Sequence, residues 1–245
     1  MFEAGLVSVS FRKLTPAQII AAAADTGLKW IEWGSDVHAP REDLARLEQL
    51  AGLQKAAGVG CCSYGTYFRL GVHHILELPQ YIQAAKILGT NTLRLWCGDR
   101  SPAEYTPEDL SNLYAQCRQA AKIAEEAGVV LCMECHNWTL TENAESALNL
   151  MQAVDSPAFR MYWQPNQYQS MAENLRYARL LAPYTENIHI FNWRGDEKFP
   201  LADALDTWRE YLSCFTGHHK LLMEFMPDGR AESLPAEAAA LYKLL

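Results

Sequence analysis

The sequence predicts a single-domain (β/α)8 TIM barrel that spans residues 1–245. Eight short apolar segments alternate with eight segments of helical periodicity, and strict alternation of strand and helix requires parallel strands. The chain length matches the ~250 residues typical of such barrels. The alternative is an open, doubly wound sheet. No G-x-G-x-x-G turn follows the first predicted strand, so the closed barrel is favoured.

The predicted strands are short apolar segments, and glycines separate several of them from the preceding helix. Gly27 and Gly89 each end a helix just before a strand begins, and Gly128 precedes the fifth strand. The eight predicted strands are Leu6–Phe11, Leu28–Trp33, Gly58–Tyr64, Asn91–Cys97, Val129–Glu134, Phe159–Gln164, Asn187–Asn192 and His219–Phe225.

The predicted helices follow the strands one by one. Thr15-Pro16 and Thr106-Pro107 each combine an N-cap residue with a proline at the first helical position, which is typical of a helix start. The predicted helices cover residues 16–24, 41–57, 76–88, 107–127, 140–154, 171–181, 201–214 and 235–245.

Composition excludes several classes of partner. A net charge of -8 and a pI of about 5.4 argue against a nucleic-acid backbone, which needs clustered Lys and Arg. No apolar run approaches the ~18 residues of a membrane span, and the N-terminus lacks the pattern of a signal peptide. Seven cysteines, most of them in apolar strands, indicate reduced thiols in a cytoplasmic protein. Cys132 and Cys135 form a CxxC, but within a strand they face opposite sides.

Active sites of (β/α)8 barrels lie at the C-terminal ends of the strands. Polar side chains gather there in this sequence, although burying an unpaired polar group costs ~2–7 kcal/mol. They are Glu32, His38, Ser63, Tyr64, Tyr67, Arg69, Arg94, Trp96, Asp99, Glu134, His136, Gln164, Asn166, His189, Asn192, Trp193, Arg194 and Glu224.

Four of these residues come from four consecutive strands and form a candidate metal site. Glu134, Gln164, His189 and Glu224 offer two carboxylates, one amide oxygen and one imidazole, which suit Mn²⁺, Mg²⁺ or Zn²⁺. The alternative interpretation is structural. The two glutamates would then pair with Arg94 or with histidines, and His189 would be a hydrogen-bonded core residue.

The chain resembles the xylose isomerase-like TIM barrel superfamily, which is the sugar phosphate isomerase/epimerase group. The resemblance covers essentially the whole chain, and it rests on the order and spacing of several short motifs. These are Trp30-Ile31-Glu32-Trp33-Gly34, Asp36-Val37-His38, Leu88-Gly89, Leu93-Arg94-Leu95-Trp96, Glu134-Cys135-His136, Ile188-His189-Ile190-Phe191-Asn192-Trp193 and Met223-Glu224.

The resemblance implies a single divalent metal held by Glu134, Gln164, His189 and Glu224. The sequence departs from the family at Gln164, where the family has aspartate, and at Asn192, where aspartate is common. An amide oxygen binds a cation more weakly than a carboxylate, so a loosely held metal is expected. The strand ends also provide too few His and Asp ligands for the trinuclear zinc site of endonuclease IV or the two-metal site of xylose isomerases.

The resemblance implies an isomerase or epimerase that acts on a keto-sugar. Glu134 and Glu224 are the expected catalytic residues, one removing a proton and the other returning one on the opposite face. Two alternatives remain: an inosose-type dehydratase, and a catalytically silent sugar-binding barrel. Barrels that the chain resembles are often homodimers, and the sequence itself leaves the oligomeric state open. The candidate substrate contacts, for which packing or solvation is an equally good explanation, are His38, Arg94, Trp96, His136, Trp193 and Arg194.

Overall fold

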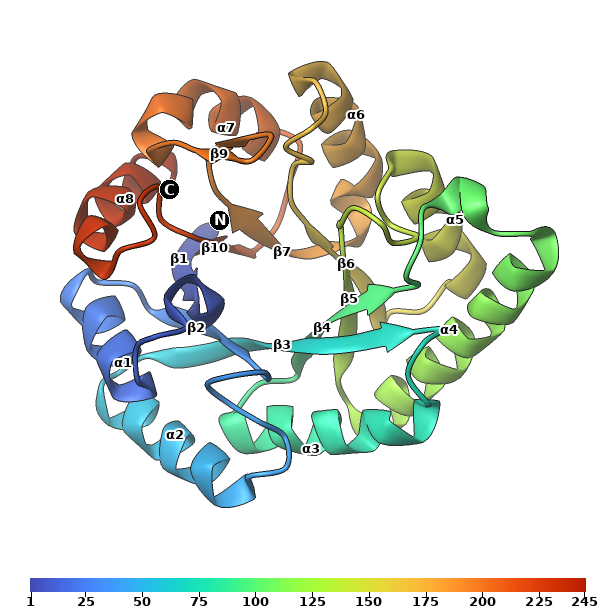
Figure 1. Cartoon of the computed structure of the whole chain (residues 1–245), viewed down its shortest axis with the longest axis horizontal. Helices are drawn as coiled ribbons and strands as arrows, with labels where there is room; N and C mark the ends of the chain where they lie inside the picture. Colours follow the sequence, from blue (N-terminus) through green and yellow to red (C-terminus); the bar gives the residue numbers. More distant parts are fainter.

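Eight parallel strands close into a barrel in the order β1-β10-β7-β6-β5-β4-β3-β2, and eight helices surround it (Figure 1). The computed structural model describes all residues from 1 to 245. The predicted single-domain (β/α)8 barrel is therefore confirmed. The barrel strands are β1 (Phe2–Val7), β2 (Trp30–Gly34), β3 (Gly60–Leu70), β4 (Thr92–Cys97), β5 (Val130–Glu134), β6 (Phe159–Trp163), β7 (Thr185–Ile190) and β10 (His219–Met223).

The helices begin at capping residues read from the sequence. Thr15 and Thr106 each accept a hydrogen bond from a backbone N–H of the first helical turn, and a proline follows each of them. Gly89 and Gly128 end their helices in the left-handed conformation that glycine adopts without strain. The helices are α1 (Pro16–Asp25), α2 (Leu44–Ala56), α3 (Leu78–Leu88), α4 (Pro107–Ala127), α5 (Ala144–Val154), α6 (Met171–Leu181), α7 (Leu205–Leu212) and α8 (Leu234–Leu241).

The first strand begins earlier than predicted. It spans Phe2–Val7, and the apolar segment Ser8–Phe11 is a 3-10 turn instead of a strand. The reason is the closure of the barrel, because residues 2–6 pair with residues 219–223 of the last barrel strand. This pairing partner is more than 200 residues away, so local periodicity does not reveal it.

Several further boundaries differ from the predictions, and one element was not predicted. Strand β3 continues to Leu70 instead of ending at Tyr64. Helix α5 begins at Ala144, because Asn143 caps it, and not at Leu140. A short antiparallel hairpin, β8 (Trp193–Arg194) with β9 (Glu197–Lys198), follows β7 and was not predicted.

The barrel has an inner and an outer core. Inside the ring, a small cluster packs Val7, Val9, Cys62, Cys132, Tyr162 and Leu222 together, and 63 other buried residues form the core between strands and helices. Cys132 belongs to the inner cluster and Cys135 to the outer core, so the two cysteines face opposite sides as predicted. All seven cysteines are free thiols.

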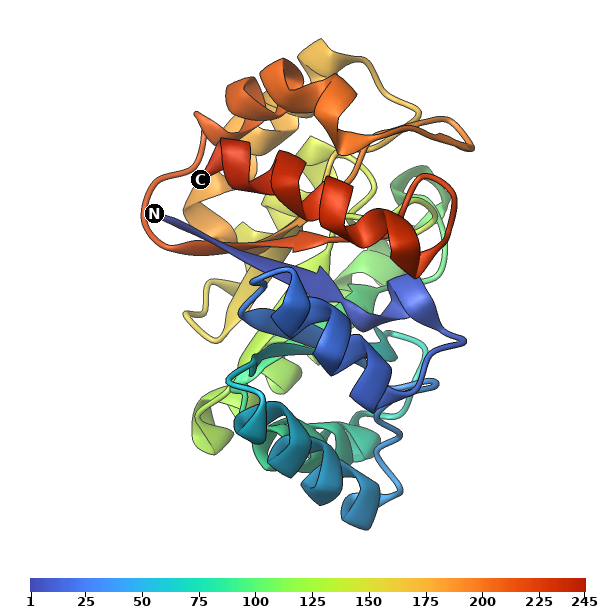
Figure 2. The ribbon, with the colours of Figure 1, turned by 90° about the vertical axis from the view of Figure 1, so that its left-hand side faces the viewer.

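Both chain termini lie at one end of the barrel, and the β8–β9 hairpin projects from the opposite end (Figure 2). The end with the hairpin is the one at which the parallel strands terminate, so the strand-end polar residues gather there. No helix has the length and apolar character needed to cross a membrane.

Candidate active site and metal centre

The four candidate ligands lie at neighbouring strand ends. Glu134 is the last residue of β5, Gln164 directly follows β6, His189 is in β7, and Glu224 directly follows β10. All four residues are buried. Because β5, β6, β7 and β10 are consecutive around the ring, their carboxyl ends converge on one spot.

The ring of His189 is the centre of this group. Its Nδ1 lies 2.8 Å from Gln164 Oε1, 3.6 Å from Glu134 Oε1 and 3.7 Å from Glu224 Oε2. The ligand atoms of Glu134, His189 and Glu224 all lie within 4.8 Å of one another. The structure therefore brings together all four residues that the sequence proposed as metal ligands, and their donor atoms suit a divalent cation.

The charge balance also suits a divalent cation. Three buried carboxylates, Glu32, Glu134 and Glu224, surround the single guanidinium of Arg94. With neutral His189, three negative charges and one positive charge leave a net charge of -2, which one divalent cation would neutralise. Without a cation, the burial of His189 is outweighed by the charges of Glu224 and Glu32, which raise the pKa of its imidazole to about 10.

Only one of the two carboxylate oxygens of Glu134 is hydrogen-bonded. Its Oε2 accepts hydrogen bonds from the guanidinium of Arg94 and from Trp96 Nε1, while its Oε1 faces His189. Burial would raise the pKa of this carboxyl, but the charge of Arg94 outweighs burial and lowers the pKa well below its ordinary value. Glu134 is thus ionised and presents one free oxygen, a geometry that suits a monodentate ligand.

Glu224 has a different environment. Its carboxylate accepts no hydrogen bond from the protein and lines the cavity. Burial raises its pKa and nearby Glu134 adds to this effect, although His189 opposes it. The next residue, Phe225, has a positive φ of 58°, and its N–H donates to Ser10 Oγ. Such strained backbone is common where a side chain must be held in place at a site.

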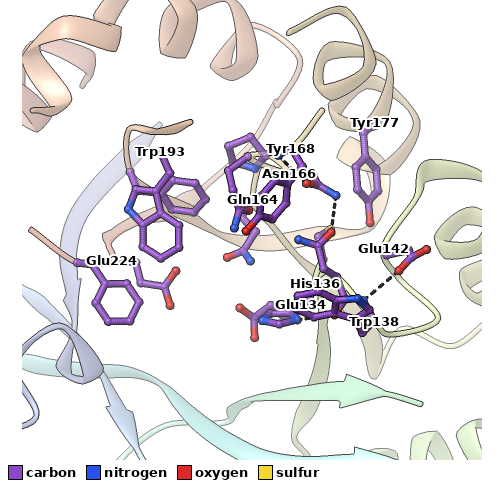
Figure 3. Close-up of a pocket in the computed structure, with 16 residues that line it drawn as sticks. Glu134, His136, Trp138, Glu142, Gln164, Asn166, Tyr168, Tyr177, Trp193 and Glu224 are labelled. Carbon is purple, nitrogen blue, oxygen red and sulfur yellow. Dashed lines mark hydrogen bonds between the residues drawn. The ribbon is translucent and has the colours of Figure 1, made fainter. Parts of the chain in front are cut away.

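A cavity of about 170 Å³ opens beside the cluster. This volume equals roughly six water molecules at ~30 Å³ each, which suits a small polar substrate. Figure 3 shows Glu134, Gln164 and Glu224 pointing into it from different strand ends. Its wall also contains polar and aromatic residues, namely His136, Asn137, Trp138, Glu142, Asn166, Gln167, Tyr168, Tyr177, Phe191, Trp193 and Phe225.

Two of the six predicted substrate contacts line this cavity: His136 and Trp193. The ring of Trp96 packs against His136 with centroids 5.0 Å apart, and its Nε1 donates to Glu134. Trp96 therefore supports the cavity wall. Arg194 lies on the hairpin, with its guanidinium over the ring of Phe199, and lines a neighbouring cavity.

Two of the predicted substrate-binding side chains make their hydrogen bonds and ion pairs within the protein. His38 is 1% exposed, with one ring nitrogen 3.2 Å from Ser8 Oγ and the other 3.2 Å from the Leu14 carbonyl. Arg94 is 4% exposed and bridges Glu32 and Glu134. Neither side chain lines the cavity, so this geometry argues for the structural alternative at both positions.

Glu32 is the residue whose importance the sequence did not reveal. It appeared among the polar strand-end residues and in one motif of the resemblance but received no role, whereas the structure places it inside the barrel next to Arg94 and His189. The charges of Arg94 and His189 outweigh its burial and lower its pKa to about 2. A carboxylate between apolar residues in Trp30-Ile31-Glu32-Trp33 was the available signal, but its partners come from β4 and β7.

Comparison with known proteins gives a family match and a set of structural neighbours. The family model described as xylose isomerase-like TIM barrel matches residues 20–219. No curated protein sequence matches the chain. Among solved structures, the probable 3-DHS dehydratase AsbF of Bacillus anthracis has a TM-score of 0.82 at 18% identity, with 99% of each chain covered.

Two other neighbours relate to sugars or metals in their descriptions. D-psicose 3-epimerase of Clostridium cellulolyticum H10, solved with D-tagatose, has a TM-score of 0.66 at 12% identity and covers 99% of this chain and 98% of its own. The IOLI protein with a bound zinc atom has a TM-score of 0.76 at 13% identity and covers 99% of this chain and 97% of its own. At these identities the likeness shows a shared fold.

Proposed function

Because the chain belongs to the xylose isomerase-like TIM barrel family, we propose that it is a divalent-metal-dependent isomerase or epimerase of a small keto-sugar or a related compound. The observation that carries this proposal is that the side chains of Glu134, Gln164 and Glu224 converge on Nδ1 of His189. This cluster lies next to a cavity of about 170 Å³. The epimerases and the zinc-containing protein among the structural neighbours support the same class.

The four ligand residues would hold the cation, and Gln164 would contribute a neutral amide oxygen. When bound there, a divalent cation would polarise a substrate carbonyl and make the neighbouring C–H more acidic. Glu134 contributes through its free Oε1, because Arg94 and Trp96 hold its other oxygen. This arrangement keeps the Glu134 carboxylate ionised and fixed in orientation.

We assign proton removal to Glu224. Its carboxylate lines the cavity without a hydrogen-bond donor from the protein, and burial raises its pKa. A carboxylate oxygen that no donor of the protein engages is free to accept a proton from the substrate. The buried location also keeps the group close to the substrate carbon and away from bulk water.

Two residues on the β5 side of the cavity can return the proton. Glu134 was expected from the sequence, but one of its oxygens is occupied. His136 is the second candidate, because its Nδ1 lies 2.8 Å from the carbonyl oxygen of Asn137. A carbonyl only accepts, so Nδ1 carries a proton, and His136 would return a proton from Nε2 in its imidazolium form, in which both ring nitrogens are protonated. His136 also lines the cavity.

The test is isotope exchange with a panel of ketoses in D2O. The Mn²⁺-loaded protein is expected to incorporate one deuterium at the isomerised or epimerised carbon. Glu224→Gln should lower the rate by about 10²–10⁴-fold, as expected for a lost general base, and should keep its fold. Epimerisation without deuterium uptake, or full activity in Glu224→Gln, would contradict the assignment.

Paired variants distinguish the two candidates for proton return. If His136 returns the proton, His136→Asn loses turnover but binds Mn²⁺ normally. If Glu134 does so, His136→Asn remains active. Glu134→Gln should weaken Mn²⁺ binding in both cases, because it removes a charged ligand.

A second candidate function is a dehydratase that removes a β-hydroxyl from a cyclic or open keto-polyol. It is favoured by the likeness to the Bacillus anthracis protein described as a probable 3-DHS dehydratase, with a TM-score of 0.82. The same base would start both reactions, since a proton next to a carbonyl is removed in each. Product mass separates them: a dehydratase product is lighter than its substrate by one water, whereas an isomerase product has the same mass.

A further inference from the structure

Glu32 lies inside the barrel, next to the ring of the candidate metal ligand His189. Its side chain comes from β2, on the far side of the ring from β7, and is fully buried. Glu32 Oε1 is 3.6 Å from Nε2 of His189, while Nδ1 of the same ring faces Gln164 and the two other carboxylate ligands. The imidazole therefore lies between the candidate ligands on one side and Glu32 on the other.

The Glu32 carboxylate is placed to accept a hydrogen bond from Nε2 of His189. Nε2 is buried and has no hydrogen-bond partner within the protein. One face of the ring packs on Tyr162, with centroids 4.6 Å apart. The carboxylate that lies closest to Nε2 is that of Glu32, at 3.6 Å, and the ring has to move by about half an ångström to make a normal hydrogen bond of ~3.0 Å.

Metal ligation decides which nitrogen carries the proton. A neutral imidazole has one N–H and one lone pair, so coordination through Nδ1 places the proton on Nε2. That N–H is then buried and requires an acceptor, since an unsatisfied buried donor costs about 1–3 kcal/mol. Metal-bound histidines usually donate their second N–H to a carboxylate or carbonyl, which fixes the orientation of the ring.

Glu32 is itself fixed by the barrel. Its Oε1 accepts from Arg94 Nε at 2.8 Å, and its Oε2 accepts from Ser63 Oγ at 2.6 Å. The neighbouring residue Gly65 leaves the space in which this pair fits, because a Cβ there would lie 2.6 Å from Glu32 Oε1. The other arm of Arg94 holds the ligand Glu134, so one guanidinium connects Glu32 to a second part of the cluster.

We propose that Glu32 is a positioning residue that accepts the Nε2 proton of His189 and thereby aims Nδ1 at the bound cation. This inference rests on the proposed function, because it assumes that Glu134, Gln164, His189 and Glu224 hold a metal. Glu32 is not a ligand and does not line the substrate cavity. It acts on the cation only through the imidazole.

The experiment is a Mn²⁺ titration of the full-length protein, followed by electron paramagnetic resonance, with three variants. Glu32→Gln has the same shape but no charge, and its affinity for Mn²⁺ should fall about tenfold. Glu32→Leu has no acceptor, and its affinity should fall about a hundredfold, the upper range for the loss of such a partner. In Co²⁺-loaded protein, both variants should change the visible ligand-field spectrum, which a purely structural role would leave unchanged.

Ser63→Ala is the matched control. It removes a hydrogen bond from the same carboxylate, but at Oε2, whereas Oε1 is the oxygen 3.6 Å from His189 Nε2. Mn²⁺ affinity and the Co²⁺ spectrum should remain close to those of the wild type. Circular dichroism verifies that each variant is folded, and Glu32→Gln alone decides the matter if Glu32→Leu does not fold.

The outcomes separate this inference from the proposed function. If the wild type and Glu32→Gln bind Mn²⁺ equally well with the same Co²⁺ spectrum, the role of Glu32 is overturned and the metal site stands. If Ser63→Ala weakens binding as much as Glu32→Gln does, packing around the carboxylate explains the effect and the inference is also overturned. If the wild type binds no divalent cation, the proposed function fails and this inference fails with it.

Discussion

At the scale of single residues, the environment of each carboxylate decides its role. Glu134 is held by Arg94 and Trp96 and its pKa is lowered, so it suits ligation. Glu224 has no such partner and its pKa is raised by burial, so it suits proton transfer. From the sequence, both glutamates were expected to bind the metal and to transfer a proton. The sequence showed two acidic strand ends, but it did not show which of the two glutamates contacts an arginine.

Gln164 gives a residue-scale prediction about metal affinity. Its Oε1 lies 2.8 Å from His189 Nδ1, at the position where the family resemblance implies an aspartate ligand. Gln164→Glu keeps the side-chain length and adds a negative charge, and affinity for divalent cations rises with the charge of the ligands. We expect Mn²⁺ to bind at least about tenfold more tightly, measured by competition with a chromophoric chelator.

The same change should destabilise the metal-free protein, because it places a fourth carboxylate in the cluster of Glu32, Glu134 and Glu224. Gln169→Glu is the control, since it adds the same charge at an exposed position of the same loop. An unchanged affinity in Gln164→Glu would mean that residue 164 does not contact the cation.

At the scale of elements, the sequence located six of the eight barrel strands to within about two residues, ended β3 six residues early and misplaced the first. Turn and capping signals such as Thr15-Pro16, Gly89 and Thr106-Pro107 are local. They were sufficient to locate the helix ends at which they lie. The placement of β1 depends on pairing with β10, and the β8–β9 hairpin depends on the loop that follows β6, because Gly195 N–H donates to the Gln167 carbonyl. Such distant contacts do not appear in local periodicity.

The pairing of β1 leads to a prediction about stability. Gly5 lies between β2 and β10, and a Cβ there would be 2.7 Å from the Trp30 carbonyl oxygen and in collision with Leu222. Because backbone cannot move aside cheaply within a closed ring, Gly5→Ala should lower the free energy of unfolding by about 1–3 kcal/mol, measured by urea denaturation.

The contrasting variant is Gly52→Ala in helix α2. A Cβ at Gly52 meets no atom within 4 Å, and alanine is favoured over glycine inside a helix by about 0.5–1 kcal/mol. This variant should therefore be more stable than the wild type. Equal stability of Gly5→Ala and the wild type would show that β1 and β10 tolerate a wider spacing.

At the scale of the whole molecule, ring closure creates the site, because β2, β4, β5, β7 and β10 each contribute one charged group to the same interior. The proximity of Glu134, Gln164, His189 and Glu224 was predictable from strand ends alone, since it needed only the order of the strands. The positions of Arg94 and Glu32 were not, because they depend on which side chains meet across the barrel. The closed ring thus buries a cluster of charges whose balance changes with pH.

This charge cluster predicts a stability optimum for the metal-free protein. The pKa of Glu32 is lowered from its ordinary value of 4.5 to about 2, so its contribution is complete above pH 4.5 and is lost as the pH falls toward 2. The pKa of His189 is raised from 6.5 to about 10, so its contribution is complete below pH 6.5 and is lost as the pH rises toward 10. With a chelator present, the contribution of this pair to the free energy of unfolding should be greatest between pH 4.5 and 6.5.

Urea denaturation across pH 3 to 9, with chelator and then with saturating Mn²⁺, tests this prediction. The metal replaces the proton on His189 Nδ1, so the loss of stability on the alkaline side should disappear when Mn²⁺ is bound. His189→Asn, which cannot be protonated, should lack that alkaline loss even with chelator, and Glu32→Gln should lose less stability on the acidic side. A wild-type protein whose stability with chelator is flat from pH 6.5 to 9 would show that His189 is not charged in the metal-free fold, which contradicts this prediction.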